Sequence, residues 1–346
     1  MSQRVTLEDI ARKSGVSPAT VSLVLRDKPG ITADTRQRVI EAARELGYAK
    51  LSPGDRGVAA AQMLHQVGIM IKAQVNDVPQ VNPFYGPVIA GIEAACRRLQ
   101  INVFLATVPV DQDNHPQELP RMLFDSQLDG IMLVGAFVDH TITHILQRQG
   151  IPTVLVDAYA TDQTYDAVVS DNIRGAYDAV SHLIQQGHRR IGLVGTTPGA
   201  YPSIADRRKG YEQALADHGI TERFYADCHM SIEEGAAAAA ALLAAHPEIT
   251  ALFCANDEVA VGVLQAARAA HKAVPADLSV VGFDNIDLAA HLNPPLTTMH
   301  IDKISLGRLA VTLLAHRAEY PDANRITSVL RPSLVERQSV RKLQRS

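Results

Sequence analysis

The chain has 346 residues, of which 47% are hydrophobic, and it carries a formal net charge of −4 at pH 7. A chain of this length exceeds one small core, and its acidic balance excludes a protein that is a nucleic-acid-binding polycation throughout. Residues 1–56 carry ten Lys/Arg and seven Asp/Glu, a net of +3, whereas the remainder carries 23 and 30, a net of −7. This asymmetry indicates a short DNA-facing head on an acidic body.

Metal sites, disulfides and membrane spans are not expected. The three cysteines, Cys96, Cys228 and Cys254, are far apart, odd in number and without metal-ligand spacing, so we expect reduced thiols. The first residues lack the apolar stretch of a signal peptide, and no apolar run approaches the roughly 20 residues that a membrane span needs. We therefore expect a cytoplasmic protein without a metal, a cofactor or a membrane partner.

Caps and apolar spacing predict three short helices within residues 1–48. The first helix is expected to start at Thr6, which stands in the spacing of a capping box with Asp9, and to end at Gly15. Ser17 followed by Pro18 marks the start of the second helix. Thr32 marks the start of a third helix that runs to Leu46 and closes at Gly47. Two helices joined by a tight turn containing glycine, with a third as support, form a helix-turn-helix. This pattern predicts an all-α DNA-binding domain over residues 1–48.

The second helix of a helix-turn-helix lies in the major groove, where its outer side chains meet base edges. Here the outer face is predicted to carry Pro18, Ala19, Ser22, Leu23 and Arg26. Hydroxyl groups at helix starts are placed to meet phosphates, and they belong to Thr6, Ser17, Thr20, Thr32 and Thr35. The same hydroxyls cap their helices, and the two roles are compatible.

Residues 5–48 resemble, without a gap, the head of the LacI/GalR family of bacterial repressors. The resemblance is carried by Val5–Ala11, Gly15–Ser22, Thr35-Arg36 and Leu46–Tyr48. It implies a dimer that binds a near-palindromic operator, with DNA contacts from Ser17, Thr20, Ser22 and Tyr48 and base-reading positions at Pro18, Ala19 and Leu23. Because one recognition helix touches too few base pairs for useful specificity, we also expect a homodimer, formed through the core.

Leu23 departs from the family, in which many members carry arginine at this position. Leucine cannot make a bidentate contact to guanine and offers only apolar contact, for example to a thymine methyl group. The alternative is that Leu23 packs against Tyr48 or against a partner. The sequence leaves both interpretations open.

Residues 49–65 are predicted to form a linker. Pro53, Gly54 and Gly57 mark a break, and the Ala-rich run Val58–Leu64 can form a short helix. The family resemblance implies a hinge helix whose leucine wedges into the minor groove, but Gly57 stands at that position. Met63 or Leu64 would have to replace the wedge. A flexible tether without DNA contact is the alternative.

From residue 66 onward, short apolar runs alternate with helix-length amphipathic stretches. The apolar runs span 67–71, 101–106, 130–134, 153–156, 190–194, 251–254 and 279–283, and the stretches between them include 84–99, 172–186, 205–218, 232–245 and 257–271. This alternation predicts an α/β fold with doubly wound parallel sheets. Because the strands are too many for one small sheet, we expect two lobes within a core of residues 66–346.

The first lobe is placed at approximately 66–161 and 302–325, and the second at approximately 162–292 and 326–340. Val168–Ala176 is taken as the start of the second lobe, and Pro294–Thr298 as a crossover back to the first. Ligands of doubly wound sheets bind beyond the carboxyl ends of the strands. Two facing lobes therefore predict one cleft between them.

The core extends the LacI/GalR resemblance over nearly the whole chain. It is carried there by Asn82–Tyr85, Gly187–Ile191, Arg207–Tyr211, Asn256-Asp257, Val281–Asp284 and Pro295–Thr298. The resemblance implies the fold of periplasmic sugar-binding proteins and a small effector that is a sugar or a sugar derivative. It implies effector-binding roles for Phe84, Tyr85 and Asp157 in the first lobe and for Arg207, Met230, Asn256 and Asp284 in the second.

The strand pattern supports three of these residues. Asp157, Asn256 and Asp284 each follow an apolar run, at the predicted carboxyl end of a strand. Carboxylate, amide and guanidinium groups bind hydroxyls, and the rings of Phe84 and Tyr85 can stack on a sugar. Alternatives stay open: Asn256 and Asp284 can cap the helices that follow them, and the aromatic pair can pack against the hinge. Asp171-Asn172 is expected to cap the helix that begins there.

Two other classes of protein are disfavoured. An enzyme needs a reactive constellation, and the sequence has no G-x-x-x-x-G-K-[ST], no G-x-S-x-G and no G-x-G-x-x-G after a strand. His188 lies in a predicted helix-to-strand turn, where a structural role is favoured over a catalytic one. An exported solute-binding protein would carry a signal and no helix-turn-helix. The sequence therefore predicts an effector-controlled transcription regulator, with repression favoured over activation because it is the family's usual mode.

Overall fold

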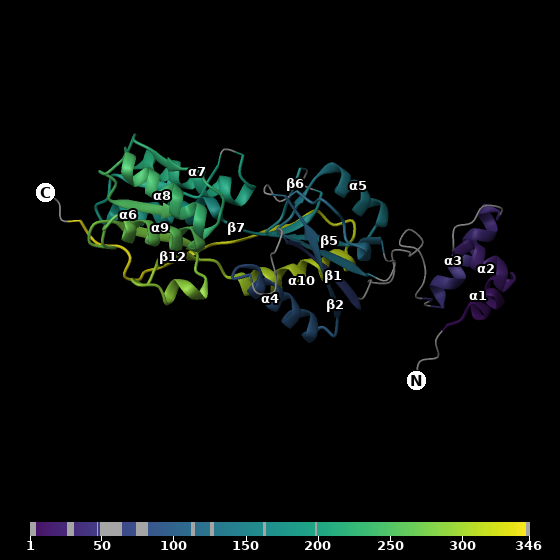
Figure 1. Cartoon of the computed structure of the whole chain (residues 1–346). Coiled ribbons are helices and arrows are strands. Elements are labelled where there is room, and N and C mark those ends of the chain that lie inside the picture. The colour runs from purple at the N-terminus through teal and green to yellow at the C-terminus, as the bar shows by residue number, and fades with distance from the viewer. Residues whose placement is uncertain are drawn as a thin grey trace.

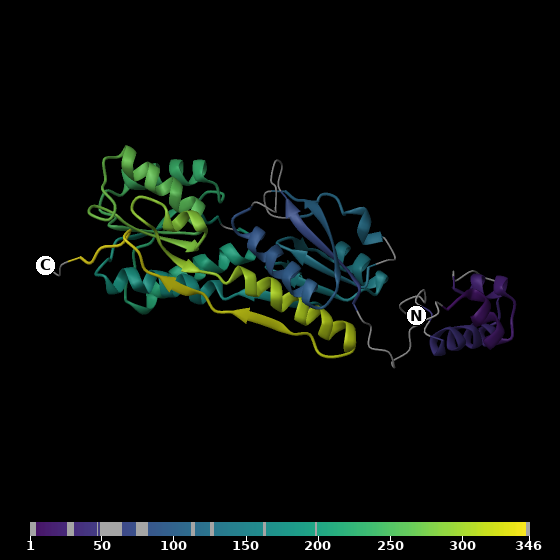
Figure 2. The same ribbon diagram turned by 90° about the horizontal axis from the view of Figure 1, so that it is seen from below.

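A computed structural model describes residues 5–25, 31–46, 48, 64–73, 82–111, 115–124, 128–161, 164–197 and 199–343. Figure 1 shows a small helical head and a larger α/β core with two sheets, and Figure 2 shows the same parts from below. The head has an apolar core of its own, made of Ile10, Ala11, Val21, Val24, Val39, Ile40, Ala42 and Ala43. The chain is therefore organised as the sequence predicted, with a head and an α/β core.

The head consists of α1 (Leu7–Ser14), α2 (Pro18–Leu25) and α3 (Ala33–Glu45). Thr6 forms the expected capping box with Asp9, and Gly15 closes α1 with a left-handed φ of 69°. The hydroxyls of Ser17 and Thr32 accept hydrogen bonds from backbone N–H groups at the starts of α2 and α3. The three expected helices are thus confirmed, with α3 ending at Glu45 and with Gly47 outside the described residues.

The first lobe is built on a six-stranded parallel sheet in the order β13-β7-β5-β3-β1-β2. Its strands are β1 (Gln66–Ala73), β2 (Asn102–Pro109), β3 (Gly130–Val134), β5 (Thr153–Val156), β7 (Asp166–Ser170) and β13 (Thr327–Leu330). The lobe also contains α4 (Tyr85–Arg98), α5 (His140–Gln149), α10 (Lys303–Glu319), η2 (Arg121–Phe124) and a two-stranded parallel sheet of β4 (Phe137–Val138) and β6 (Tyr159–Ala160). Every residue of β3 and β5 is buried, as expected for strands covered on both faces.

The second lobe has a six-stranded sheet in the order β14-β12-β11-β10-β8-β9, in which only β14 is antiparallel to its neighbour. Its strands are β8 (Ile191–Val194), β9 (Phe224–Ala226), β10 (Ala251–Cys254), β11 (Ser279–Asp284), β12 (Thr297–His300) and β14 (Ser333–Val335). Its helices are α6 (Asn172–Gln185), α7 (Pro202–Asp217), α8 (Ile232–Ala245), α9 (Asp257–Ala269) and η3 (Asp287–Ala290). Asp171 caps α6 as expected, since its side chain accepts from the N–H group of Arg174.

The division between the lobes differs from the sequence prediction at three strands. β7 and β13 were placed in the second lobe, but β7 pairs with β5 and β13 pairs with β7 in the first-lobe sheet. β12 lies in the segment taken as a crossover, yet it pairs with β11 in the second lobe. The chain crosses between lobes only after each of these strands is complete, near residues 171, 301 and 331. The strand–helix alternation did not reveal this, because it does not say which sheet a strand joins.

Two helices of the first lobe pack with their backbones in contact. A Cβ atom placed on Gly91 of α4 would lie 2.2 Å from the carbonyl oxygen of Ile304, and one on Gly307 of α10 would lie 2.2 Å from that of Val88. Only glycine permits such an approach. Figure 2 shows α10 beside α4. This contact holds α10 on the first lobe, although the chain enters that helix from the second.

Leu64 belongs to the core and not to the linker. Its side chain is 8% exposed and forms part of the apolar cluster that includes Val67 and Ile69 of β1. The neighbouring His65 is held by a hydrogen bond from its N–H group to Asp129. Of the two residues considered as a minor-groove wedge, Met63 or Leu64, Leu64 does not fit that role here, because its side chain is packed in the core. The other linker residues, 49–63, which include Gly57 and Met63, lie outside the described residues.

Candidate functional site

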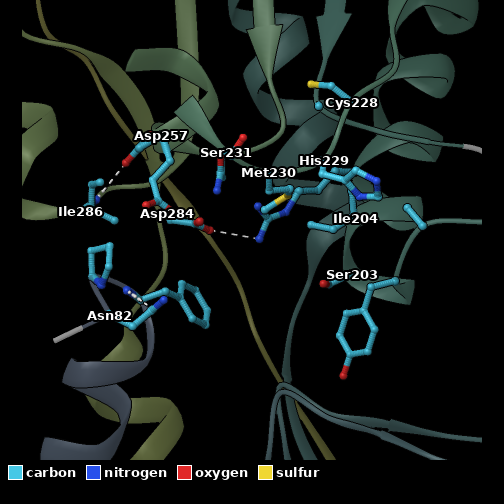
Figure 3. A pocket seen from close by; sticks show the side chains of 18 of the residues that line it. Asn82, Ser203, Ile204, Cys228, His229, Met230, Ser231, Asp257, Asp284 and Ile286 are labelled. Atoms are coloured by element: carbon cyan, nitrogen blue, oxygen red, sulfur yellow. Dashed lines mark hydrogen bonds and ion pairs between the residues drawn. The ribbon is translucent and has the colours of Figure 1, made fainter. Parts of the chain in front are cut away.

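A cavity of about 420 Å³ opens between the two lobes, at the carboxyl ends of their strands. The structure brings together all seven predicted effector residues on its walls: Phe84, Tyr85, Asp157, Arg207, Met230, Asn256 and Asp284. Figure 3 shows Met230, Ser231 and Asp284 on one side and Asn82 on another. The roles of these residues in binding an effector stay predictions, but their convergence on one cavity is a feature of the fold.

Arg207 on α7 is the most heavily bonded side chain of the second-lobe wall. Its Nη2 donates to Oδ1 of Asp284 at 3.0 Å, its Nε donates to Oδ1 of Asn172 at 3.0 Å, and its Nη1 donates to the carbonyl oxygen of Ala255. The guanidinium also lies 3.9 Å from the ring centroid of Phe283. Only 5% of the Arg207 side chain and 7% of the Asp284 side chain are exposed, so the pair is a buried salt bridge.

Asp284 ends β11 in an unusual backbone conformation. Its φ is 101° and that of the next residue, Asn285, is 49°, so two consecutive non-glycine residues lie in the left-handed region. Burial raises the pKa of the Asp284 carboxyl, and the positive charges of Arg207 and Lys303 oppose that rise. The alternative that Asp284 caps a helix does not hold, because the residue preceding η3 is Ile286 and the carboxylate pairs with Arg207.

Asn256 caps a helix and also stands on the cavity wall, while its role in binding an effector stays a prediction. Its Oδ1 accepts from the N–H group of Val259 at 2.8 Å, which makes it the N-cap of α9. The residue also lines the cavity. The cap uses one lone pair of Oδ1, and the amide NH2 group is the part of Asn256 that can donate to a ligand.

Asp257 is a buried carboxyl that sequence reasoning missed. It accepts from the hydroxyl of Thr298 at 2.6 Å and from the N–H group of Ile286 at 2.8 Å, the second of which is drawn in Figure 3. Burial, followed by the nearby charge of Asp284, raises the pKa of Asp257 to about 7. Its place directly after the capping residue Asn256 was the one available signal, since the first turn of a helix at a strand end points toward the cleft.

The first-lobe wall centres on Asp157, which follows β5 with a φ of 47°. The hydroxyl of Tyr85 donates to Oδ2 of Asp157 at 3.1 Å. Burial raises the pKa of Asp157 to about 6, while the charges of Lys72 and Arg207 oppose that rise. Phe84 meets Tyr85 edge to face, with ring centroids 5.0 Å apart, so the aromatic pair is held rigid at the cavity wall.

Tyr201 joins the two lobes across the cavity. It precedes α7 of the second lobe, yet its hydroxyl lies 3.2 Å from the carbonyl oxygens of both Ala136 and Asp157 in the first. Its ring meets that of Tyr159 edge to face at a centroid distance of 5.4 Å, and the ammonium of Lys72 lies 5.3 Å from its centroid. Neither Tyr201 nor Lys72 was predicted, because no local pattern marks a residue that acts across lobes.

The proposed DNA-facing side chains lie on the surface of α2 and at helix starts. Ser17, Pro18 and Ala19 are exposed, and Leu23 is 43% exposed and outside the apolar core of the head. Much of the Leu23 side chain is therefore open to solvent in the head, whereas Tyr48 packs on the apolar core. The hydroxyls of Ser17 and Thr20 lie 2.9 Å apart. Arg26 lies outside the described residues.

His188 has the structural role that the sequence favoured. Its Nδ1 lies 2.9 Å from the hydroxyl of Thr250 and its Nε2 lies 3.1 Å from the carbonyl oxygen of Arg341. His188 is not among the residues that line the cavity. Burial lowers the pKa of His188 to about 4, so the ring is neutral at pH 7. It ties the C-terminal segment to β10.

Among the residues that the structure describes, no helix is long and apolar enough to cross a bilayer. The same residues contain no group of three or more His, Cys, Asp or Glu side chains placed to hold a metal ion.

A helix-turn-helix head joined to a two-lobed core with a polar cavity between the lobes defines the class of ligand-controlled DNA-binding proteins. Residues 6–50 match the family model for bacterial regulatory proteins of the lacI family, and residues 180–340 match that for a periplasmic binding protein-like domain. The ribose operon repressor of Haemophilus influenzae is 32% identical over 342 residues, covering 97% of this chain and 98% of that protein. The transcriptional repressor CytR of Escherichia coli is 32% identical over 340 residues, covering 98% of this chain and 97% of the relative.

Solved structures agree with these relatives. A complex of the transcriptional regulator CelR with cellobiose has a TM-score of 0.68 at 26% identity and covers 97% of this chain and 100% of its own. A LacI-family regulator from Enterococcus faecium with bound ribose has a TM-score of 0.70 at 27% identity and covers 81% of this chain and 100% of its own. The chain belongs to the lacI family of bacterial regulatory proteins. It is a DNA-binding transcription regulator and not an enzyme.

Proposed function

We propose that this regulator represses transcription in the cytoplasm by binding a near-palindromic operator as a homodimer, and that a small carbohydrate in the interlobe cavity controls operator affinity. The observation that carries the proposal is the placement of buried hydrogen-bonding groups on opposite walls of one cavity. Asp157 with Tyr85 stands on the first lobe, and Asp284 with Arg207 on the second. A ligand that bonds to both walls favours one arrangement of the lobes and thereby acts on the heads.

The chemistry of the cavity supports a neutral sugar. Carboxylates outnumber cations among its lining residues: Asp157, Glu234, Asp257, Glu258 and Asp284 against Lys72 and Arg207. Carboxylates accept hydrogen bonds from hydroxyl groups and repel phosphate. Two similar proteins also support a sugar: the Haemophilus influenzae relative is named a ribose operon repressor, and the structure of the Enterococcus faecium regulator contains ribose.

A binding panel tests the proposal. The full chain is titrated calorimetrically with D-ribose, D-glucose and cellobiose, each beside its phosphate ester. At least one neutral sugar is expected to bind, and its ester to bind at least about tenfold more weakly, because placing the negative charge of the phosphate beside buried carboxylates is costly. Tighter binding of an ester would contradict the preference for neutral sugars. Binding of nucleobases but of no sugar, by protein that binds DNA normally, would contradict the carbohydrate assignment itself.

Sugar binding is expected to release protons. In the free protein, burial raises the pKa of Asp157 to about 6 from an ordinary value of 3.8. A sugar hydroxyl that donates to the carboxylate favours its charged form, so the pKa falls on binding. The complex then holds fewer protons than the free protein between about pH 4 and about pH 6, and affinity rises with pH through that window.

Calorimetry at about pH 5.5 in two buffers of different ionisation enthalpy measures the released protons. Asp157→Asn keeps the shape of the side chain but cannot titrate, so release at that pH should shrink in this variant. An affinity that falls as the pH rises from about 4 to about 6 would contradict the assignment of Asp157 as a hydroxyl acceptor.

Base reading is expected to depend on Leu23. Because Leu23 is exposed on α2, Leu23→Arg should change the preferred base at one position of each half-site. Thr20→Ala should instead lower affinity for all sites alike, since a phosphate contact carries no sequence information. Selection of bound sites from random DNA measures both effects. An unchanged base profile for Leu23→Arg would show that Leu23 does not face the groove.

The homodimer is proposed to bury the edge strand β2. Phe104 on this strand is 47% exposed, Leu105 is 38% exposed and the adjacent Leu99 is 47% exposed. An edge strand with apolar side chains is expected to be covered in the assembled protein. Phe104→Asp should therefore yield a monomer in sedimentation experiments and weaken operator binding. Phe124→Asp, at a residue that is 58% exposed on η2 of the same lobe, is the matched control and should stay dimeric. A dimeric Phe104→Asp variant would place the interface elsewhere.

A further inference from the structure

Lys303 is a buried lysine at the point where the chain returns to the first lobe. It is the first residue of α10, only 7% of it is exposed, and it follows the crossover at residue 301. Its ammonium donates to the carbonyl oxygens of Asp284 at 2.5 Å, Asn285 at 3.2 Å and Ile301 at 3.4 Å. All three N–H groups of the ammonium therefore have an acceptor. Two of these acceptors lie at the end of β11, in the second lobe.

The two carbonyl groups from the second lobe belong to the left-handed pair Asp284-Asn285. Left-handed backbone at a non-glycine residue is unfavourable and persists only where the surroundings hold it. Second-lobe groups provide part of that hold, since the guanidinium of Arg337 donates to Oδ1 of Asn285 at 2.8 Å and Asp257 accepts from the N–H group of Ile286. Among the hydrogen bonds of the described residues, those from Lys303 are the ones that reach this turn from a first-lobe helix.

The electrostatic setting of Lys303 is also specific. Burial lowers the pKa of Lys303, and the charges of Asp284 and Asp257 oppose that change. The ammonium lies 6.0 Å from the ring centroid of Phe84, which lines the first-lobe wall of the cavity. The Lys303 ammonium thus lies between Phe84 of the first lobe and the backbone of Asp284 in the second lobe. Lys303 is not among the residues that line the cavity.

We propose that Lys303 is a positioning residue that holds the Asp284-Asn285 turn from the first lobe and so couples occupancy of the cavity to the arrangement of the lobes. The proposal rests on the function proposed above. A sugar that bonds to Asp284 contacts a turn that is hydrogen-bonded to Lys303 of α10. The free energy of that contact therefore depends on how the two lobes are arranged. Without the ammonium, the same sugar contact would act on the second lobe alone.

Lys303→Met tests this inference, because methionine keeps an unbranched apolar chain and lacks the ammonium. Lys209→Met on the exposed face of α7, where the lysine side chain is 64% exposed in a surface ion pair, is the matched control. Sugar affinity is measured with whichever of D-ribose, D-glucose or cellobiose binds the wild type most tightly, and operator affinity is measured with and without that sugar. Lys303→Met should bind operator normally without sugar, bind sugar about tenfold more weakly and show a coupling ratio near 1, whereas Lys209→Met should behave as wild type.

A readout without ligand keeps the test independent of the carbohydrate assignment. Hydrogen exchange of residues 283–287 should be at least about tenfold faster in Lys303→Met than in wild type, with exchange in β1 and β3 unchanged. Lys303→Arg keeps the charge and should restore part of the protection. Unchanged exchange in 283–287, or a wild-type coupling ratio in Lys303→Met, would overturn the proposal. Faster exchange throughout the core would also overturn it, because it would show a general stabilising role.

Discussion

Asp284→Ala is expected to abolish the response of operator binding to the effector while leaving operator binding itself intact. The carboxylate is buried, pairs with Arg207 at 3.0 Å and stands on the cavity wall. Truncating one partner of a buried charged pair at a binding site weakens binding by about 2–5 kcal/mol, which is roughly thirtyfold or more in affinity. Because the head has its own core and does not include Asp284, its contacts with DNA are expected to survive.

Loss of stability is the rival explanation for such a result. Asp284→Ala leaves the Arg207 guanidinium buried without its partner, which should lower the free energy of unfolding by about 3–5 kcal/mol. The double variant Asp284→Ala/Arg207→Met removes both charges and should recover part of that loss, but it should still not respond to effector. Operator affinity with and without effector, measured for both variants, separates the two explanations. A normal response in either variant would place the pair outside the switch.

Arg317→Met is expected to destabilise the core more than any surface substitution. Arg317 on α10 forms two hydrogen bonds with the carboxylate of Asp166, at 2.7 and 3.0 Å, and the two side chains are only 5% and 1% exposed. Its other N–H groups donate to the carbonyl oxygens of Tyr320, Pro321, Ala323 and Asn324. These bonds fix the turn that leads from α10 into β13. Breaking a buried pair of this kind costs about 3–5 kcal/mol.

Chemical unfolding of the core measures the loss. The matched control is Arg331→Met, whose wild-type side chain is 67% exposed and meets Asp178 at 3.6 Å. An exposed pair contributes at most about 1 kcal/mol, so the control should unfold nearly as wild type does. Equal effects of the two variants would show that the Arg317–Asp166 pair does not anchor β13.

Local rules were enough to predict the head. The capping box of Thr6 and Asp9, the closing Gly15 and the hydroxyl of Ser17 are each set by residues within a few positions of one another. For the same reason Asp171 was correctly expected to cap α6. The outward position of Leu23 was left open because it depends on what the third helix covers, which the spacing along α2 does not say.

The lobes and the site were predictable only in part. Parallel strands end at one edge, so Asp157 and Asp284 could be expected at the cleft from their places after apolar runs. Tyr201 and Lys303 could not, since each acts on backbone atoms of the other lobe and no spacing in the chain encodes that contact. The prediction that β13 belongs to the second lobe was wrong for a related reason, because sheet membership is decided by pairing and not by the order of elements.

The most direct test of the account is the reciprocity between sugar and operator. Sugar affinity is measured with and without saturating operator, and operator affinity is measured with and without saturating sugar, using the full chain. If the cavity controls the heads, the two ratios must be equal and differ from 1, typically by about 5- to 150-fold. A sugar that binds in the cavity, loses affinity in Asp284→Ala and yet leaves operator affinity unchanged would contradict the claim that this cavity is the switch.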